Sequence, residues 1–345
     1  MKWFKAWLMA IVVFAVIPLS TATAAGTYIM DGADPSILRQ DGVYYSVQSD
    51  NNGIHLRKSS TLTGLGSFST QTTVWWRAAD LQQIWAPEIA KINNEYWIFF
   101  AASPGAANES FEVLNARHRT YALKASNPAG PYTYMGKVNL PDDRWSIDTT
   151  FVSYNNKHYL VWSGWAGTTD GEQNIYMAEV DVNNPMIMRS GRAIISQPRE
   201  AWERKDVNPS AYVNEGPQPI VKDGRLLIAF SANGSWGSNY CLGYVRLKAN
   251  GDPLNVAHYA KSDSCKFQTS STIIGPGHHS WILDGLSGTN QIAYHGVPAS
   301  QANTGGDWWA KRDILYKGIT WQTQNMWHSW ENRWDSGPVP IFGEP

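Results

Sequence analysis

The chain has 345 residues, with 28 basic and 29 acidic side chains and a formal net charge of −1. Neither sign of charge forms a long run, which excludes the basic surface of a nucleic-acid-binding protein. After residue 25 no apolar stretch reaches the roughly 18 residues that a membrane-spanning helix needs, so we expect neither a nucleic-acid nor a membrane partner for the mature chain.

Residues 1–25 have the pattern of a secretory signal peptide. Lys2 and Lys5 supply a positive start, an apolar stretch follows over residues 8–19, and small residues at 22–25 offer a cleavage site. We therefore predict an exported, extracellular protein whose mature part, residues 26–345, is one domain. Its two cysteines, Cys241 and Cys265, are predicted to form a disulfide, and two buried free thiols are the alternative.

A turn followed by an aromatic or β-branched strand recurs along the mature chain. Each turn is rich in Asn, Asp or Gly, which adopt the positive φ angles of tight hairpins, and the turns begin at residues 41, 93, 155, 223 and 288. A further strand follows each hairpin, at residues 54–57, 121–124, 175–178, 242–245 and 314–316. Repeats of this kind predict an all-β fold, a five-bladed β-propeller. A two-domain β-sandwich is the alternative, but it would not explain the even spacing.

Three carboxylates stand ahead of these hairpins. Asp34 and Asp148 lie ten residues before the strand that follows the turn, and Glu215 lies eleven residues before it. The strand before each hairpin is the innermost of its blade, so we expect the three carboxylates to converge at one mouth of the channel. Taken singly, each is also compatible with an ordinary turn residue. Converging carboxylates repel one another, but a pair with different pKa values is what glycoside hydrolysis requires.

The chain also holds 18 tryptophans, several times ordinary usage. Indole rings cover the C–H faces of sugar rings well, because they offer rigid apolar area with a polar edge. Any single one is as readily a core residue, so only the excess is informative. Those that stand beside Gly, Ser or Asp rather than inside apolar runs include Trp75, Trp76, Trp85, Trp145, Trp165, Trp236, Trp308 and Trp309.

Short motifs follow one another in order: Ala33-Asp-Pro-Ser-Ile37, Trp85-Ala-Pro-Glu88, Ile147-Asp148, Glu215-Gly-Pro217 and Gly275-Pro-Gly-His-His-Ser280. Together they resemble glycoside hydrolase family 43, the five-bladed arabinanases, arabinofuranosidases and xylosidases, over residues 27–345. The resemblance implies an inverting hydrolase in which Asp34 is the general base and Glu215 the general acid. It implies that Asp148 tunes the pKa of the acid and orients it.

The resemblance also implies two sugar-binding residues, Trp85 at the floor of the site and Arg312 in the subsite of the sugar to be released. His278 matches a histidine that in many members helps to hold a buried ion, often calcium, through water. A neutral buried histidine without an ion is the alternative. No cofactor is expected for the chemistry. His279 and Gly296 depart from the Asn and Ala of the family pattern, which leaves the exact sugar open.

The motifs of the fourth and fifth repeats resemble most the exo-acting branch, which implies release of α-L-arabinofuranosyl units from plant cell-wall arabinan or arabinoxylan by a monomer. β-Xylosidase, endo-arabinanase and β-galactosidase activities remain alternatives, because loops shape the outer subsites. A noncatalytic sugar-binding propeller is an alternative of another class. The three carboxylates distinguish it from an enzyme, since a lectin needs no cluster of like charges.

Overall fold

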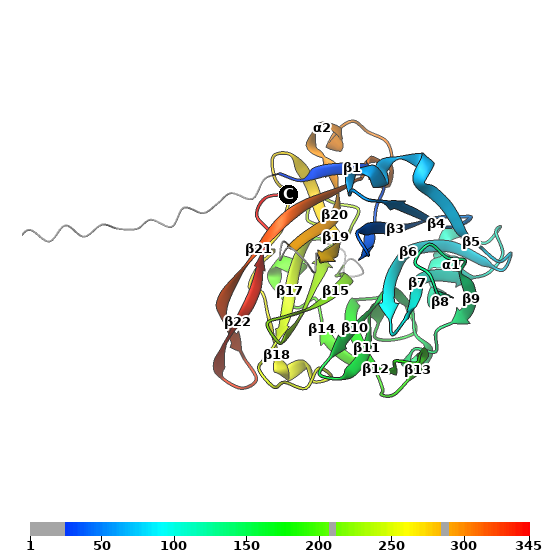
Figure 1. Ribbon diagram of the computed structural model, residues 1–345. Helices are drawn as coiled ribbons and strands as arrows, with labels where there is room; N and C mark the ends of the chain where they lie inside the picture. The colour runs from blue at the N-terminus through cyan, green and yellow to red at the C-terminus, as the bar shows by residue number, and fades with distance from the viewer. Residues whose placement is uncertain (1–24, 207–211, 284–289) are drawn as a thin grey trace, which may run out of the picture.

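A computed structural model describes residues 25–206, 212–283 and 290–345. In these residues five antiparallel sheets are arranged around one axis, so the predicted five-bladed β-propeller is confirmed (Figure 1). The predicted signal peptide lies outside the described residues except for Ala25, and so does the turn predicted at residue 288. No helix of the described residues has the length and apolarity needed to cross a bilayer.

The first four blades each consist of consecutive antiparallel strands. Blade one contains β2 (Ser36–Gln40), β3 (Val43–Asp50), β4 (Gly53–Ser59) and β5 (Gln71–Trp76). Blade two contains β6 (Leu81–Ile92), β7 (Glu95–Pro104), β8 (Arg119–Ala125) and β9 (Thr133–Lys137). Blade three contains β10 (Ser146–Tyr154), β11 (Lys157–Trp165), β12 (Gln173–Asp181), β13 (Asn184–Met188) and β14 (Ala193–Ser196). Blade four contains β15 (Asn214–Lys222), β16 (Arg225–Ala232), β17 (Cys241–Leu247) and β18 (Tyr259–Lys261).

Blade five joins the two ends of the chain. Its strands are β19 (Ile273–Leu283), β20 (Asn290–Pro298), the first part of β21 (Asp313–His328) and, on its outer side, the N-terminal strand β1 (Thr27–Asp31). β1 runs antiparallel to β21 with Tyr28 opposite Leu315, which closes the ring. The distal part of β21 pairs with β22 (Arg333–Ile341) as a hairpin beyond the blade. The repeat pattern predicted neither β1 nor this hairpin.

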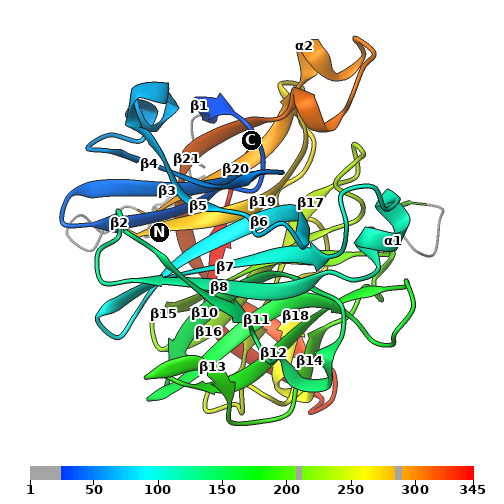
Figure 2. The ribbon, with the colours of Figure 1, turned by 90° about the vertical axis from the view of Figure 1, so that its right-hand side faces the viewer.

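Short helices occupy loops between strands. Two α-helices are α1 (Phe111–Asn115) and α2 (Ala299–Ala302), which lie toward the same end of the molecule in Figure 2. Single 3-10 turns cover Thr63–Gly66, Phe68–Thr70, Pro141–Asp143, Ala201–Glu203, Val256–His258 and Trp309–Lys311. None of these helices contributes a layer of its own to the fold.

The core is divided among the interfaces between neighbouring blades. Successive side chains of a strand point to opposite faces, so one strand serves two interfaces. In β16, Leu226, Ile228 and Phe230 pack against blade three, whereas Leu227 and Ala229 pack against blade five. Each fully buried Leu, Ile or Phe contributes about 1.5–3 kcal/mol relative to its exposed form. Rows of such residues hold the blades in fixed register around the axis.

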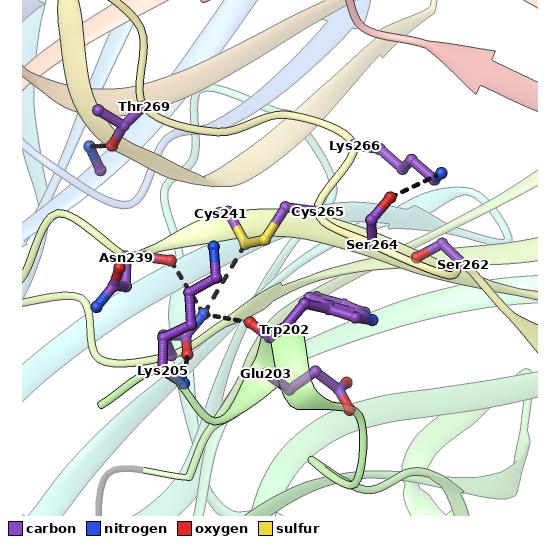
Figure 3. The surroundings of a disulfide bond; sticks show 12 residues. Trp202, Glu203, Lys205, Asn239, Cys241, Ser262, Ser264, Cys265, Lys266 and Thr269 are labelled. Carbon is purple, nitrogen blue, oxygen red and sulfur yellow. Dashed lines mark hydrogen bonds between the residues drawn. A yellow bond between two sulfur atoms is a disulfide. The ribbon is translucent and has the colours of Figure 1, made fainter. Parts of the chain in front are cut away.

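One disulfide ties blade four to the loop that follows β18. Cys241 and Cys265 are bonded, with 5.8 Å between their Cα atoms, as the sequence predicted. Asn233 donates from the same Nδ2 to the carbonyl oxygens of Trp202 and Asn239. Figure 3 shows Trp202 and Asn239 in the surroundings of the disulfide. Cys241 directly follows Tyr240, so this cross-link fixes the start of β17 where the chain leaves the channel mouth.

Candidate active site

The innermost strands β2, β6, β10, β15 and β19 contact one another in order around the axis. At the same height each blade has one residue in the left-handed region: Asp34, Ala86, Asp148, Gly216 and His278. In the last four of these blades the strand pairing shifts register at this residue. The shared break turns side chains from the sheet toward the channel.

This geometry corrects the predicted register of blade four. The residue equivalent to Asp34 and Asp148 is Gly216, with φ of 54°, and Glu215 lies one position earlier. That offset explains why Glu215 stands eleven rather than ten residues before its hairpin strand. A Cβ on Gly216 would lie 3.2 Å from Cγ of His278, so glycine suits both the backbone angle and the close approach.

A cavity of about 620 Å³ opens at this mouth, and the structure brings all three predicted carboxylates to it. Asp34 enters from blade one, Asp148 from blade three and Glu215 from blade four. Asp148 and Glu215 are buried, whereas the side chain of Asp34 is 31% exposed. The cavity therefore presents carboxyl groups from different sides to whatever occupies it.

Two histidines hold Asp34. Nδ1 of His278 lies 3.1 Å from Oδ1 of Asp34, and the backbone N–H of Asp34 donates to Nδ1 of His295 over 3.0 Å. Burial alone would raise the pKa of Asp34, but the charge of His278 and the hydrogen bond from its Nδ1 lower it well below its usual value. Burial lowers the pKa of His295 to about 3, which agrees with a neutral ring that accepts through Nδ1.

Asp148 and Glu215 have the opposite tendency. Burial, with the nearby charge of Glu215, raises the pKa of Asp148 to about 8 against the opposing charge of His278. Burial also raises the pKa of Glu215, although the Tyr240 hydroxyl, which donates to Oε1 over 2.8 Å, acts against the rise. Asp148 Oδ2 accepts the backbone N–H of Gly216 over 2.8 Å, directly beside Glu215. Desolvated like charges disfavour full ionisation, so this side of the cavity retains a proton.

Aromatic side chains form much of the cavity wall. Trp85, one of the predicted sugar-binding residues, lines it together with Trp145, Trp165, Trp236, Trp309 and Phe111. The rings of Trp145 and Trp165 stack with centroids 4.7 Å apart and planes 3° apart. Beneath Trp85 lies the buried ring of His118, with centroids 3.8 Å apart. Such walls offer flat apolar area to sugar rings.

Other members of the predicted tryptophan group lie elsewhere. Trp75 packs in the interface between blades one and two, and Trp76 is exposed on the edge strand β5. Neither lines the cavity.

Arg312, the second predicted sugar-binding residue, is not among the residues that line the cavity. Its guanidinium is buried and contacts two residues that do line it: it donates to the Ser235 carbonyl and lies 3.9 Å from the centre of the Trp309 ring. Its charge acts on both Asp34 and Glu215. Among the described contacts its Nη1 has no hydrogen-bond partner.

His278 lies between two carboxylates. Its Nδ1 faces Asp34, and its Nε2 lies 3.5 Å from Oε1 of Glu88. Although burial opposes it, the charges of Asp34 and Asp148 raise the pKa of His278 well above its usual value. An imidazolium with both nitrogens turned to carboxylates does not fit direct ligation of a cation. In the described part of the chain, no three His, Cys, Asp or Glu side chains group into a metal site.

The sequence did not reveal two residues that define the site. Tyr240, which contacts Glu215, precedes a cysteine at the start of β17, and His295, which contacts Asp34, lies within β20. Their rings also stack on each other, with centroids 5.6 Å apart. Neither carries a local motif, because each gains its role from a neighbour on another strand. The sequence signal that could have indicated them is a polar residue inside or directly before an apolar strand, near the end of the strand that faces the channel mouth.

Comparisons with known proteins agree with this architecture. Residues 27–327 match the family model described as "Glycosyl hydrolases family 43". The chain is 32% identical to an extracellular exo-alpha-(1->5)-L-arabinofuranosidase of Streptomyces avermitilis, over 76% of this chain and 54% of that protein. It is 31% identical to alpha-L-arabinofuranosidase 43 of Humicola insolens, over 80% and 57%. The chain thus spans about half the length of these curated relatives.

One solved structure is similar to this chain over nearly the whole length of both. The crystal structure of alpha-L-arabinofuranosidase from Lactobacillus brevis superposes with a TM-score of 0.76 at 27% identity, covering 92% of this chain and 95% of that one. The endo-arabinase from Bacteroides thetaiotaomicron has a TM-score of 0.63 at 20% identity, which shows a shared fold alone.

Proposed function

Since the chain belongs to glycosyl hydrolase family 43 and its substrate is therefore a carbohydrate, we propose that it releases α-L-arabinofuranosyl units from arabinan or arabinoxylan with inversion at the anomeric carbon. The observation that carries the proposal is one cavity in which Asp34 has a lowered pKa while Glu215 and Asp148 have raised pKa values. A noncatalytic sugar-binding protein has no use for this arrangement. The names of the relatives support arabinofuranose as the sugar.

In the proposed reaction, Glu215 gives its proton to the glycosidic oxygen as the bond to the anomeric carbon breaks. Asp34, ionised, takes a proton from a water molecule whose oxygen attacks that carbon from the opposite face. The products are free arabinose and the shortened polymer, and the two carboxyls regain their starting states by proton exchange with solvent. Asp148 orients the segment of Glu215 through the Gly216 N–H, and it takes part in tuning the pKa of the acid as a neighbouring buried carboxyl whose own pKa is raised in part by Glu215.

Sugar recognition is assigned to Trp85 at the cavity wall, and to Arg312 as the residue that orients the terminal sugar. Arg312 contacts two residues that line the cavity, Ser235 and Trp309, which places its guanidinium beside the proposed sugar site. No cofactor takes part in the chemistry. A calcium ion held through water beside His278 stays a prediction, and metal analysis of the dialysed protein tests it.

Export is part of the proposal. Residues 1–25 would direct the chain out of the cell and be removed, leaving the domain of residues 26–345. The disulfide between Cys241 and Cys265 and the extracellular relative support this location.

Hydrolysis of aryl α-L-arabinofuranosides, β-xylosides and β-galactosides, together with linear and branched arabinan, tests the activity. We expect the arabinofuranoside to be cleaved fastest and arabinan to yield arabinose alone. Xylose release at the higher rate would replace the proposal by a β-xylosidase, and oligomeric products from linear arabinan would replace it by an endo-arabinanase.

A further inference from the structure

The hairpin of β21 and β22 carries a group of exposed tryptophans outside the cavity. Trp327 and Trp334 face each other across the two strands, with ring centroids 5.3 Å apart, and Trp330 lies in the turn between them. Their exposed fractions are 41%, 66% and 75%, respectively. Exposed indoles at this density are costly in water, so they indicate a binding surface.

The two faces of this hairpin differ in composition. On the outward face the two indoles are followed along the strands by the exposed neutral residues Asn325 and Thr323 in β21 and Ser336 in β22. On the inward face Met326 and Asp335 are buried against blade four. The strand period thus places aromatic rings and uncharged hydrogen-bonding groups side by side on one surface.

Buried polar contacts hold this surface rigidly. Arg246, fully buried in β17, donates to the carbonyls of Gln324 and Gly337, one on each strand of the hairpin, over 2.9 and 2.7 Å. Arg225 pairs with Asp335 over 2.7 Å. The strands that carry the indoles are therefore held in place before a ligand binds, which lowers the entropy cost of binding.

The surface is separate from the cavity. β21 begins at Asp313, next to Arg312 beside the cavity, and its 16 residues at roughly 3.3 Å each carry the chain about 50 Å along the strand before the turn. Figure 1 shows the hairpin extending from blade five along the outside of β17 and β18. A ligand on the tryptophans would leave the catalytic mouth free.

From these contacts we propose that the outward face of the β21–β22 hairpin is a second carbohydrate-binding site, which holds an uncharged polysaccharide chain while the cavity acts on it. The neutral face matches a neutral glycan, since the charges that flank it are paired: Glu331 lies 2.7 Å from Arg333 and also contacts Lys248, and Asp335 pairs with Arg225 on the inward side. Three indoles bury about 450–750 Å² at most, which covers a few sugar rings but falls short of the about 800 Å² per partner of a stable protein interface. The choice of polysaccharide rests on the proposed function.

Native electrophoresis through gels that contain arabinan, arabinoxylan or no polysaccharide tests this site. We expect the wild type to be retarded by at least one of these polysaccharides. The double variant Trp327→Ala/Trp334→Ala should bind about tenfold more weakly, a loss of the size that stacking on two indoles provides. Trp327→Phe/Trp334→Phe should keep most of the retardation. Trp76→Ala, which removes an exposed indole from blade one, serves as the matched control and should migrate like the wild type.

The same double variant should cleave a soluble aryl arabinofuranoside as fast as the wild type, but act more slowly on insoluble arabinoxylan. Equal migration of double variant and wild type in every gel would overturn the proposal. So would light scattering that finds a wild-type dimer and a monomeric double variant, because a second copy would then be the occupant. Retardation needs no hydrolysis, so tryptophan-dependent binding without arabinose release would refute the proposed function and leave this site standing.

Discussion

At the scale of single residues, the different surroundings of the carboxyl groups in the cavity shift their pKa values in opposite directions. Asp34 is held by a charged histidine and its hydrogen bond, which favour its ionised form, whereas burial favours the protonated form of Glu215. Groups with pKa values pushed apart in this way can act as base and acid at the same pH. These opposite directions support the proposed roles of Asp34 as base and Glu215 as acid.

Removing either group should abolish most of the activity. We expect Asp34→Asn and Glu215→Gln each to lower kcat on arabinan by about 10²–10⁴-fold, the contribution of a positioned general acid or base. The exposed turn residue Asp223 provides a matched control, since Asp223→Asn changes a carboxyl far from the cavity and should leave kcat within twofold, roughly the scatter expected for a surface site. Polymeric substrate is needed, because an activated aryl leaving group can hide loss of the acid. A fully active Glu215→Gln enzyme would remove Glu215 from the mechanism.

Tyr240 offers a test that depends on pH rather than on rate alone. Its hydroxyl lowers the pKa of Glu215 by donating to the ionised form, so Tyr240→Phe should raise that pKa further. Activity falls as pH rises through the pKa of the acid, so the alkaline limb of the kcat/KM profile should move to higher pH. The acid limb, set by Asp34, should stay in place. An unchanged alkaline limb would show that Glu215 does not control it.

Asp148 should lower the stability of the folded protein at neutral and alkaline pH, where its buried carboxyl loses its proton. Its folded pKa, raised to about 8 mainly by burial, exceeds the ordinary value of 3.8, so the folded state binds this proton more tightly than the unfolded state. Its stabilising contribution is complete below about pH 4 and is lost as pH rises toward 8. Asp148→Asn, which can still accept the Gly216 N–H, should therefore raise Tm at pH 7–8 and change it little at pH 4. A Tm difference that does not grow with pH would contradict this balance.

At the scale of elements, each blade carries a left-handed residue at its inner strand, within the strand in blades two to five and just before β2 in blade one, and different residues fill this position. Asp and His tolerate positive φ, and blade four places Gly there so that His278 can approach. Glu215 consequently reaches the cavity from the neighbouring position. The Glu-Gly-Pro sequence thus reflects a local backbone requirement as well as the chemistry of its carboxylate.

The disulfide should support the start of β17, where Tyr240 meets the acid. Cys241 and Cys265 are 24 positions apart, and a loop of this size gains about 3 kcal/mol from cross-linking. We expect Cys241→Ser/Cys265→Ser to lower the free energy of unfolding by an amount of this order in urea titration. Activity of the folded fraction should also fall, and dithiothreitol should affect the wild type but not the variant. Equal unfolding midpoints would show that the bond is dispensable.

At the scale of the whole molecule, the repeats predicted the fold because the turns and strands of most blades are visible as local sequence patterns. The three carboxylates could be found by counting within those repeats. β1 could not, since its partner β21 lies at the other end of the chain and closure depends on the whole ring. Tyr240 and His295 were missed because each gains its role from a residue on another strand, Glu215 and Asp34 respectively. Arg312 was predicted to bind sugar, but the structure gives it buried contacts with Ser235 and Trp309.

The most direct test of the central claim is the anomeric configuration of the first sugar released. Proton NMR can follow an aryl α-L-arabinofuranoside during the first minutes of hydrolysis, before mutarotation mixes the anomers. Base-assisted attack of water opposite the bond that Glu215 protonates predicts β-L-arabinofuranose as the initial product, and its loss in Asp34→Asn. Initial release of the α anomer would contradict the account, because it requires a covalent intermediate and a nucleophilic carboxylate in place of a base.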